Sequence, residues 1–184
     1  FTVRKGIIGM RPRSVLRWSW RVIIVVGVLS FASATHAQRI AIVVPEKSDF
    51  STRVAEDLAR LLDEKGSGRI DLDAADSAFR TFPQQDLFNL EISHGKELGS
   101  LLGADVNVLI KAGTQRRTSL ERAGYFESSA AIYLVSSRSG QLIHWGLTTF
   151  DGENENAAEK GLLLTLPTLA ENTLQKARTI YRSE

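Results

Sequence analysis

The pattern of apolar and polar positions divides most of the chain into strands and helices. Ile40–Val44 is a run of apolar residues ended by Pro45, which is typical of a strand buried on both faces of a sheet. Apolar residues then recur at helical spacing over 54–62. Ser48, Asp49 and Ser51 can cap the start of this segment, and Gly66 can cap its end. These patterns predict a central strand followed by an amphipathic helix.

The middle of the chain repeats this order. Ile70–Ala74 alternates apolar residues with aspartates, which predicts a second strand buried on one face. Asn89–Leu102 carries leucines at helical spacing and is followed by Gly103, so we expect a second helix there. Val106–Ala112 is again apolar and predicts a third strand. Alternating strands and helices are the order of a layered α/β sheet.

The last third of the chain follows a different pattern. Ser129–Ser136 and Gln141–Phe150 are rich in β-forming residues, and the short polar loop Ser137–Gly140 between them allows only an antiparallel hairpin. From residue 158 to residue 180, apolar positions keep one helical phase through Pro167. We therefore expect a single helix, kinked at the proline.

Together these elements predict one α/β domain over residues 38–184, with a mixed β-sheet flanked by helices in the order β-α-β-α-β-β-β-α. A hydrophobic content of 43% and a charged content of 24% are ordinary for a globular protein, so composition agrees with this fold class.

Residues 1–37 have the pattern of a signal peptide preceding this domain. A basic segment is followed by the apolar stretch Val22–Ala32 and by the small, polar residues Ser33–Ala37. The apolar stretch is shorter than the ~20 residues that a membrane-spanning helix needs. We expect cleavage after Ala37, which would make the domain periplasmic or secreted. An uncleaved anchor is the alternative, and Met10 is an alternative start because the sequence begins with Phe1.

Charge and composition exclude several classes of function. Six of the 23 basic residues and none of the 21 acidic residues precede Ala37, so the remaining 17 basic and 21 acidic residues give the domain a net charge of −4. This charge does not support nucleic-acid binding. The sequence contains no cysteine, which rules out disulfides, thiolate metal sites and lipid attachment at a cysteine within it. No G-x-S-x-G motif or phosphate loop is present, and we expect no cofactor.

One histidine suggests an alternative chemistry. His94 has Glu91 and Glu97 three residues away on either side, so three potential ligands lie near one face of the expected helix. They could hold a metal in a small-ligand or metal-dependent enzyme centred on His94. However, His94 also occupies the apolar stripe of Leu90 and Leu98, and this position favours a partly buried structural histidine.

Two further patterns concern packing. Glycines recur every four residues from Gly95 to Gly103, which would let the helix backbone approach the sheet closely. Alternation in the last strand places Ile143, Trp145 and Leu147 on one face and His144 on the other.

A basic and aromatic segment is our candidate for a binding region. Arg116, Arg117 and Arg122 lie between the third strand and the hairpin, next to Tyr125 and Phe126. Such a segment on a loop could meet an acidic protein surface or a phospholipid headgroup, although solvent contact is the simpler explanation. We predict that these five residues bind a partner.

Three motifs resemble a family of bacterial envelope domains. They are the strand Arg39–Pro45 (RIAIVVP), the helix-to-strand turn Gly95–Asp105 (GKELGSLLGAD) and the hairpin Leu134–Trp145 (LVSSRSGQLIHW). The family includes the amino-terminal domain of TolB, the curli secretion protein CsgG and lipoprotein activators of peptidoglycan synthases. Ser136 and Ser139 replace the aspartate and threonine usual in the family's hairpin. The resemblance implies a mixed-sheet domain that binds proteins without catalysis.

We therefore expect a non-catalytic periplasmic adaptor or accessory domain that binds another cell-envelope protein through an exposed sheet edge or helix surface. It would reach a membrane only through that partner or through an uncleaved leader. Two alternatives are open: the enzyme centred on His94, and a subunit of an oligomeric secretion assembly, for which self-association would be the sign.

Overall fold

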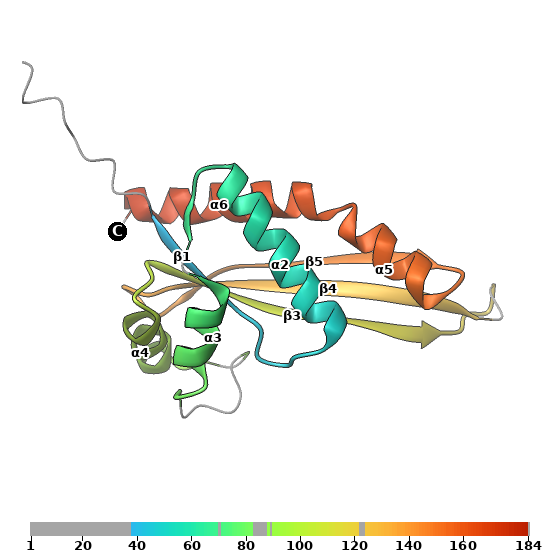
Figure 1. Cartoon of the computed structure of the whole chain (residues 1–184), viewed down its shortest axis with the longest axis horizontal. Helices are drawn as coiled ribbons and strands as arrows, with labels where there is room; N and C mark the ends of the chain where they lie inside the picture. Colours follow the sequence, from blue (N-terminus) through green and yellow to red (C-terminus); the bar gives the residue numbers. More distant parts are fainter. Residues whose placement is uncertain (1–37, 70, 83–87, 89, 122–123, 184) are drawn as a thin grey trace, which may run out of the picture. The chain divides into compact units, whose positions relative to one another are not determined.

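The computed structural model describes residues 38–69, 71–82, 88, 90–121 and 124–183. The predicted signal peptide, residues 1–37, lies outside these residues, as does Arg122. The described elements are, in chain order, β1 (Arg39–Val43), α2 (Asp49–Glu64), β2 (Gly68–Arg69), α3 (Leu72–Phe79), α4 (Ile92–Leu102), β3 (Val106–Arg117), β4 (Tyr125–Ser136), β5 (Leu142–Gly152), α5 (Glu155–Leu163) and α6 (Leu166–Ser183) (Figure 1).

The strands form one mixed sheet in the order β2-β1-β3-β4-β5. β1 is parallel to both of its neighbours, whereas β3, β4 and β5 form an antiparallel meander. The predicted fold class and the hairpin around the loop Ser137–Gly140 are confirmed. Gly140 closes this hairpin with a φ of +73°, a left-handed conformation that glycine adopts at no steric cost.

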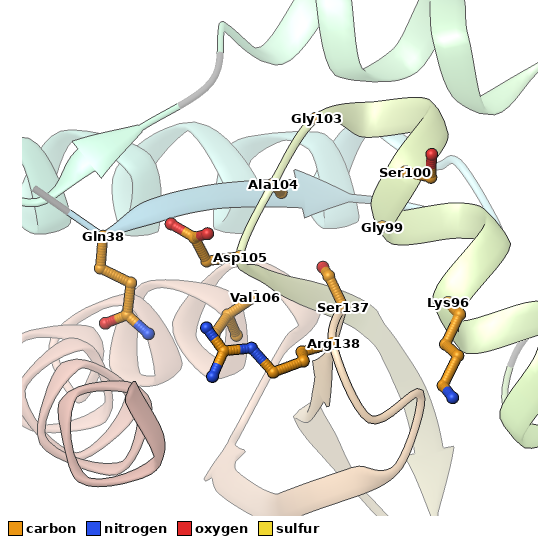
Figure 2. A pocket seen from close by; sticks show the side chains of 10 residues that line it. All are labelled: Gln38, Lys96, Gly99, Ser100, Gly103, Ala104, Asp105, Val106, Ser137 and Arg138. Atoms are coloured by element: carbon orange, nitrogen blue, oxygen red, sulfur yellow. The ribbon is translucent and has the colours of Figure 1, made fainter. Parts of the chain in front are cut away.

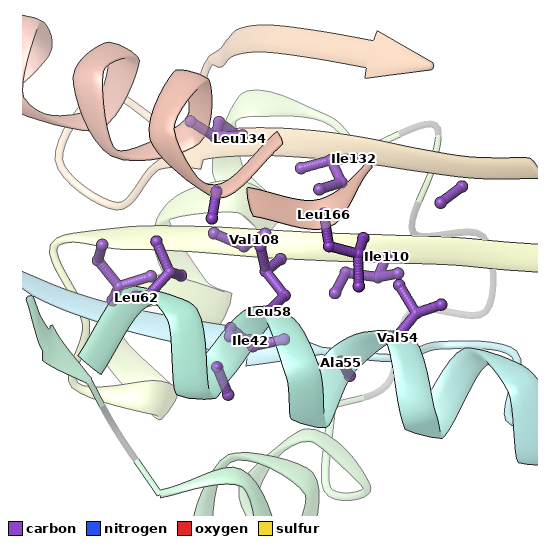
Figure 3. Close-up of a cluster of buried hydrophobic side chains, with 14 of the residues drawn as sticks. Ile42, Val54, Ala55, Leu58, Leu62, Val108, Ile110, Ile132, Leu134 and Leu166 are labelled. Carbon is purple, nitrogen blue, oxygen red and sulfur yellow. The ribbon is translucent and has the colours of Figure 1, made fainter. Parts of the chain in front are cut away.

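Helices α2, α5 and α6 cover one face of the sheet, which we name the covered face (Figure 3). α2 starts at a capping box, in which the backbone N–H of Ser51 donates to the Ser48 hydroxyl (3.0 Å) and the N–H of Ser48 donates to the Ser51 hydroxyl (2.7 Å). Its apolar stripe then packs against the sheet. The buried side chains that meet here include Val54, Leu58, Leu62, Ile42, Val108, Ile110, Ile132, Leu134 and Leu166.

The opposite face is covered only in part, by α3 and α4. Their buried residues Ala75 and Leu98 pack with Ala41 and Val43 of β1 and Leu109 of β3. β5 has no buried residue, and β3 has none after its fifth residue.

On this face, Tyr133 packs at the margin of the cluster formed by α3 and α4. Its register partner is Trp145, and the next pair on the same face is Ala131 with Leu147. We name these four residues the bare surface, because α3 and α4 leave each of them at least partly exposed.

The second strand differs from the prediction. β2 is limited to Gly68–Arg69, and residues 72–74, predicted to continue a strand, are the first turn of α3. The reason is local, because the Asp71 side chain accepts hydrogen bonds from the backbone N–H groups of Asp73 and Ala74. This is an N-cap, and it outweighs a five-residue alternation.

The prediction of one kinked helix at the end of the chain was also wrong. Leu164 and Thr165 separate α5 from α6, and Pro167 is the second residue of α6. A proline lacks a backbone N–H, and the first turn of a helix does not need one. Pro167 therefore lies near a helix start, where it causes no kink.

A bulge changes the orientation of Ile143. The register between β4 and β5 shifts at Leu134/Val135, and Ile143 packs against the core of the covered face. The alternation in the sequence predicts Ile143 on the same face as Trp145, but Trp145 lies on the opposite face. A bulge inserts one extra residue and so reverses the alternation on one side of it.

Candidate functional site

The predicted binding residues lie at the far end of the β3–β4 hairpin. Arg116 pairs with Phe126, and Arg117 pairs with Tyr125. The prediction of a loop at Arg116 and Arg117 was wrong, because both strands continue to this point in an unbroken antiparallel ladder. Four of the five candidate residues are thus brought together. Arg122 lies outside the described residues.

The two pairs point to opposite sides of the hairpin. Side chains alternate along a strand, and paired residues share a face. Arg116 and Phe126 are in phase with the buried residues Ile110 and Ala130 of the covered face. Arg117 and Tyr125 therefore point to the side of the bare surface. This division was not predicted, because a loop was expected at these residues.

The hairpin end has its own contacts. The guanidinium of Arg117 donates to the Glu127 carboxylate through Nε (3.2 Å) and Nη2 (3.1 Å). Leu120, beyond the strands, is fully exposed. Neither core cluster includes Tyr125 or Phe126, which are half-buried. We name Arg116, Arg117, Leu120, Tyr125 and Phe126 the hairpin end. It presents charge and apolar area without contributing to the core.

His94 packs in the protein as a structural side chain would. It is partly buried, and its ring meets Phe82 edge-on with the centroids 6.5 Å apart. Glu91 and Glu97 are both exposed. Within the described part of the chain, no three histidine or carboxylate side chains form a group that could hold a metal. The alternative of an enzyme centred on His94 draws no support from this geometry.

The glycine line of α4 has the predicted packing role. A Cβ added at Gly95 would overlap the Gly140 carbonyl, and one at Gly99 would overlap the side chain of Ser137. The glycines therefore bring the helix backbone against the β4–β5 turn, and not against the strands themselves. Gly103 ends the helix in the left-handed conformation, with a φ of +62°.

A hollow of about 330 Å³ lies beside this contact, and Figure 2 shows its lining. Its charged residues are Lys96, Asp105 and Arg138. Asp105 has a structural partner, because its carboxylate accepts the backbone N–H of Arg39 at 2.7 Å. Lys96 and Arg138 are exposed and form no ion pair with another described residue. The hollow thus carries two available cations at the start of β5.

The exposure of β5 was not predicted from the sequence. Trp145 and Leu147 were expected on one face of a strand, yet each is 57% exposed. The sequence carries no signal of this exposure, because the lack of charged residues between Gln141 and Phe150 favours a buried strand.

Comparison with known proteins shows what the fold is similar to. No protein-family model and no curated protein match the sequence. Among solved structures, lipoprotein GNA1162 from Neisseria meningitidis aligns with a TM-score of 0.50 and 19% identity, over 75% of this chain and 98% of that one. The hypothetical protein CT253 from Chlamydia trachomatis aligns with a TM-score of 0.48 and 12% identity, over 77% of this chain and 99% of that one. The LpoB C-terminal domain from Salmonella enterica aligns with a TM-score of 0.41 and 13% identity, over 69% of this chain and 92% of that one.

The chain therefore shares its fold with a bacterial lipoprotein. Membership of the family that includes TolB and CsgG stays a hypothesis based on the three sequence motifs. None of the helices in the described part of the chain is long and apolar enough to cross a membrane.

Proposed function

We propose that this chain is a non-catalytic adaptor of the bacterial envelope, which binds another protein through the hairpin end. The main observation is that two strands of 12 residues each extend past the buried part of the sheet and end in paired cationic and aromatic residues. A hairpin of this length is not needed for the core. The lipoprotein fold and the leader pattern support a place in the envelope.

The two-sided arrangement suggests how the partner is bound. Arg116 with Phe126 faces one side, and Arg117 with Tyr125 faces the other. A partner that contacts both pairs must enclose the hairpin end in a groove. The groove would be apolar, because aromatic residues supply much of the binding energy in protein interfaces. Its rims would be acidic, because arginine side chains bind carboxylates.

Photo-crosslinking in intact cells tests this proposal. A photoreactive residue at position 120 should yield a discrete adduct with one envelope protein. The same residue at position 60, which is an exposed position of α2, should not. The adduct is identified by mass spectrometry and the partner is then purified. If both positions give the same adducts, contact at the hairpin end is non-specific and the proposal fails.

Binding to the purified partner then measures each side of the hairpin. Tyr125→Ala and Phe126→Ala should each weaken binding by about tenfold, and the double variant should weaken it by about a hundredfold. The midpoint of thermal unfolding should remain almost unchanged, since neither residue belongs to a core cluster. Loss of binding in only one single variant would mean that the partner covers one face. Full binding by the double variant would overturn the assignment.

A further inference from the structure

The two edges of the sheet differ in how well they are protected. β2 forms one edge with only two residues, and such a short strand offers little to pair with. β5 forms the other edge with 11 residues, and no other described strand pairs with its outer side. Natural edge strands are usually blocked by charge or proline. β5 has neither from Leu142 to Phe150.

Apolar side chains follow this edge on both faces. The exposed large hydrophobic residues of β5 are Leu142, Trp145, Leu147 and Phe150. Leu164, in the break between α5 and α6, is 82% exposed and lines the same hollow as Leu147. Single exposed apolar residues are common, but several along the open edge of one strand are typical of a protein interface.

Opposite charges lie at the two ends of β5. Arg138 precedes the strand in the β4–β5 turn, where its guanidinium extends away from the turn (Figure 2). Glu153 and Glu155 follow the strand. All three are exposed, and none forms an ion pair with another residue in the described ranges. β5 therefore has no charged residue before Asp151, with a cation before its start and the acidic residues Asp151, Glu153 and Glu155 at its end.

This distribution is self-complementary. In an antiparallel pair, the start of one strand lies beside the end of the other. Two copies of β5 paired in this way would bring Arg138 of each copy to the end that carries Glu153 and Glu155 of the other. Parallel pairing would instead place like charges together, which is destabilising.

We propose that β5 pairs with β5 of a second copy of this chain, antiparallel and around a two-fold axis at Leu147. Leu147 then lies opposite itself, and Trp145 lies opposite Thr149 of the second copy. The bare surfaces of the two copies become continuous, and the unpaired backbone groups of β5 gain partners. A closed two-fold dimer of this kind uses the same patch on both copies. The proposal of this dimer does not rest on the proposed function, because the hairpin end takes no part in the dimer contact.

Cysteine crosslinking tests the register directly, because the natural sequence contains no cysteine. In full chains carrying Leu147→Cys, the two thiols would face each other across the axis, at a spacing that a disulfide spans. Mild oxidation should therefore give a disulfide-linked dimer in high yield. Leu120→Cys, at the more exposed hairpin end, should give no disulfide-linked dimer. Similar yields from both variants would overturn the proposed pairing.

Sedimentation equilibrium of the full chain tests the energetics. The unmodified chain should be a reversible dimer. Leu147→Arg places two like charges together at the axis and should raise the dissociation constant by about a hundredfold, whereas Leu120→Arg should leave it unchanged. Circular dichroism checks that both variants remain folded. A monomer at all concentrations, a larger assembly, or a dimer insensitive to Leu147→Arg would each overturn the proposal.

A charge exchange separates this dimer from general stickiness of an apolar strand. Arg138→Glu should weaken the dimer by about tenfold, since it faces two carboxylates of the second copy. Adding Glu153→Arg and Glu155→Arg to the same chain should restore the original dissociation constant. If Arg138→Glu has no effect, or if the triple variant is not restored, the antiparallel register is wrong.

Discussion

The covered face and the opposite face of the sheet are built from the same strands but are buried to different extents. In β4, Ala130, Ile132 and Leu134 are buried beneath the helices of the covered face. The residues between them, Ala131 and Tyr133, are only partly buried. Because successive side chains alternate, one strand can supply the core on one side and an accessible surface on the other. The covered face stabilises the domain and leaves the opposite face available for binding.

The same leucine truncation on the two faces tests this difference most strongly. Leu134 is completely buried on the covered face, and Leu147 on β5 is 57% exposed. Leu134→Ala should lower the free energy of unfolding by about 2–5 kcal/mol, because it leaves a cavity in the core. Leu147→Ala should lower it by less than about 1 kcal/mol. Urea unfolding of the full chain gives both values, at dilution sufficient to keep the chain monomeric. Equal losses would show that β5 belongs to the core.

Much of the fold could be predicted because its signals are local. The apolar run of β1, the stripe of α2 and the polar turn between β4 and β5 each lie within a few residues of sequence. The errors came where a local pattern fits two structures. Residues 70–74 alternate like a strand, yet Asp71 also caps a helix. Pro167 fits a kink as well as a helix start.

The site was harder to predict because it depends on non-local pairing. The end of β3, Gly113–Arg117, has no apolar alternation, and it is a strand because β4 lies beside it. The sequence therefore indicated the residue types at the hairpin end but neither their strand conformation nor their two faces. The bare surface depends on where α3 and α4 pack, and no pattern within β5 specifies that.

Glycine substitutions compare the covered and the open parts of the opposite face on a smaller scale. Gly99 of α4 contacts the β4–β5 turn, whereas a Cβ added at Gly113 of β3 would meet no atom within 4 Å. Alanine normally stabilises a helix relative to glycine by about 1 kcal/mol. We expect Gly99→Ala to be destabilising by about 1–3 kcal/mol nevertheless, because the overlap with Ser137 forces α4 away from the turn. The thermal unfolding midpoint measures the change.

Gly113→Ala is the matched control. It should be neutral or stabilising by up to about 1 kcal/mol, since glycine weakens a strand and the added methyl group meets only open space. A stabilising Gly99→Ala would contradict the close contact between α4 and the hairpin turn. Alanine at 113 that is as destabilising as alanine at 99 would mean that this part of β3 is covered.

The ion pair on α3 should give the smallest effect, and it depends on pH. α3 is part of the limited cover of the bare side, and Asp76 on it binds Lys47 (2.7 Å) and Arg80 (2.9 Å). The hydrogen bond from Lys47 is the main cause that lowers the pKa of Asp76 below its ordinary value of 3.8. Because the folded state has the lower pKa, the stabilisation is complete above the ordinary pKa and is lost as the pH falls through the lowered pKa.

Asp76→Asn should therefore lower the free energy of unfolding by about 0.5–1 kcal/mol at neutral pH, and the difference from the unmodified chain should disappear in acid, once the pH is below the lowered pKa of Asp76. Urea unfolding measured across this pH range records both. Lys47→Gln should give a similar loss, and the double variant should lose little more than either single variant, because both changes remove the same interaction. A difference that persists at the lowest pH would have to come from the shape of the side chain and not from its charge.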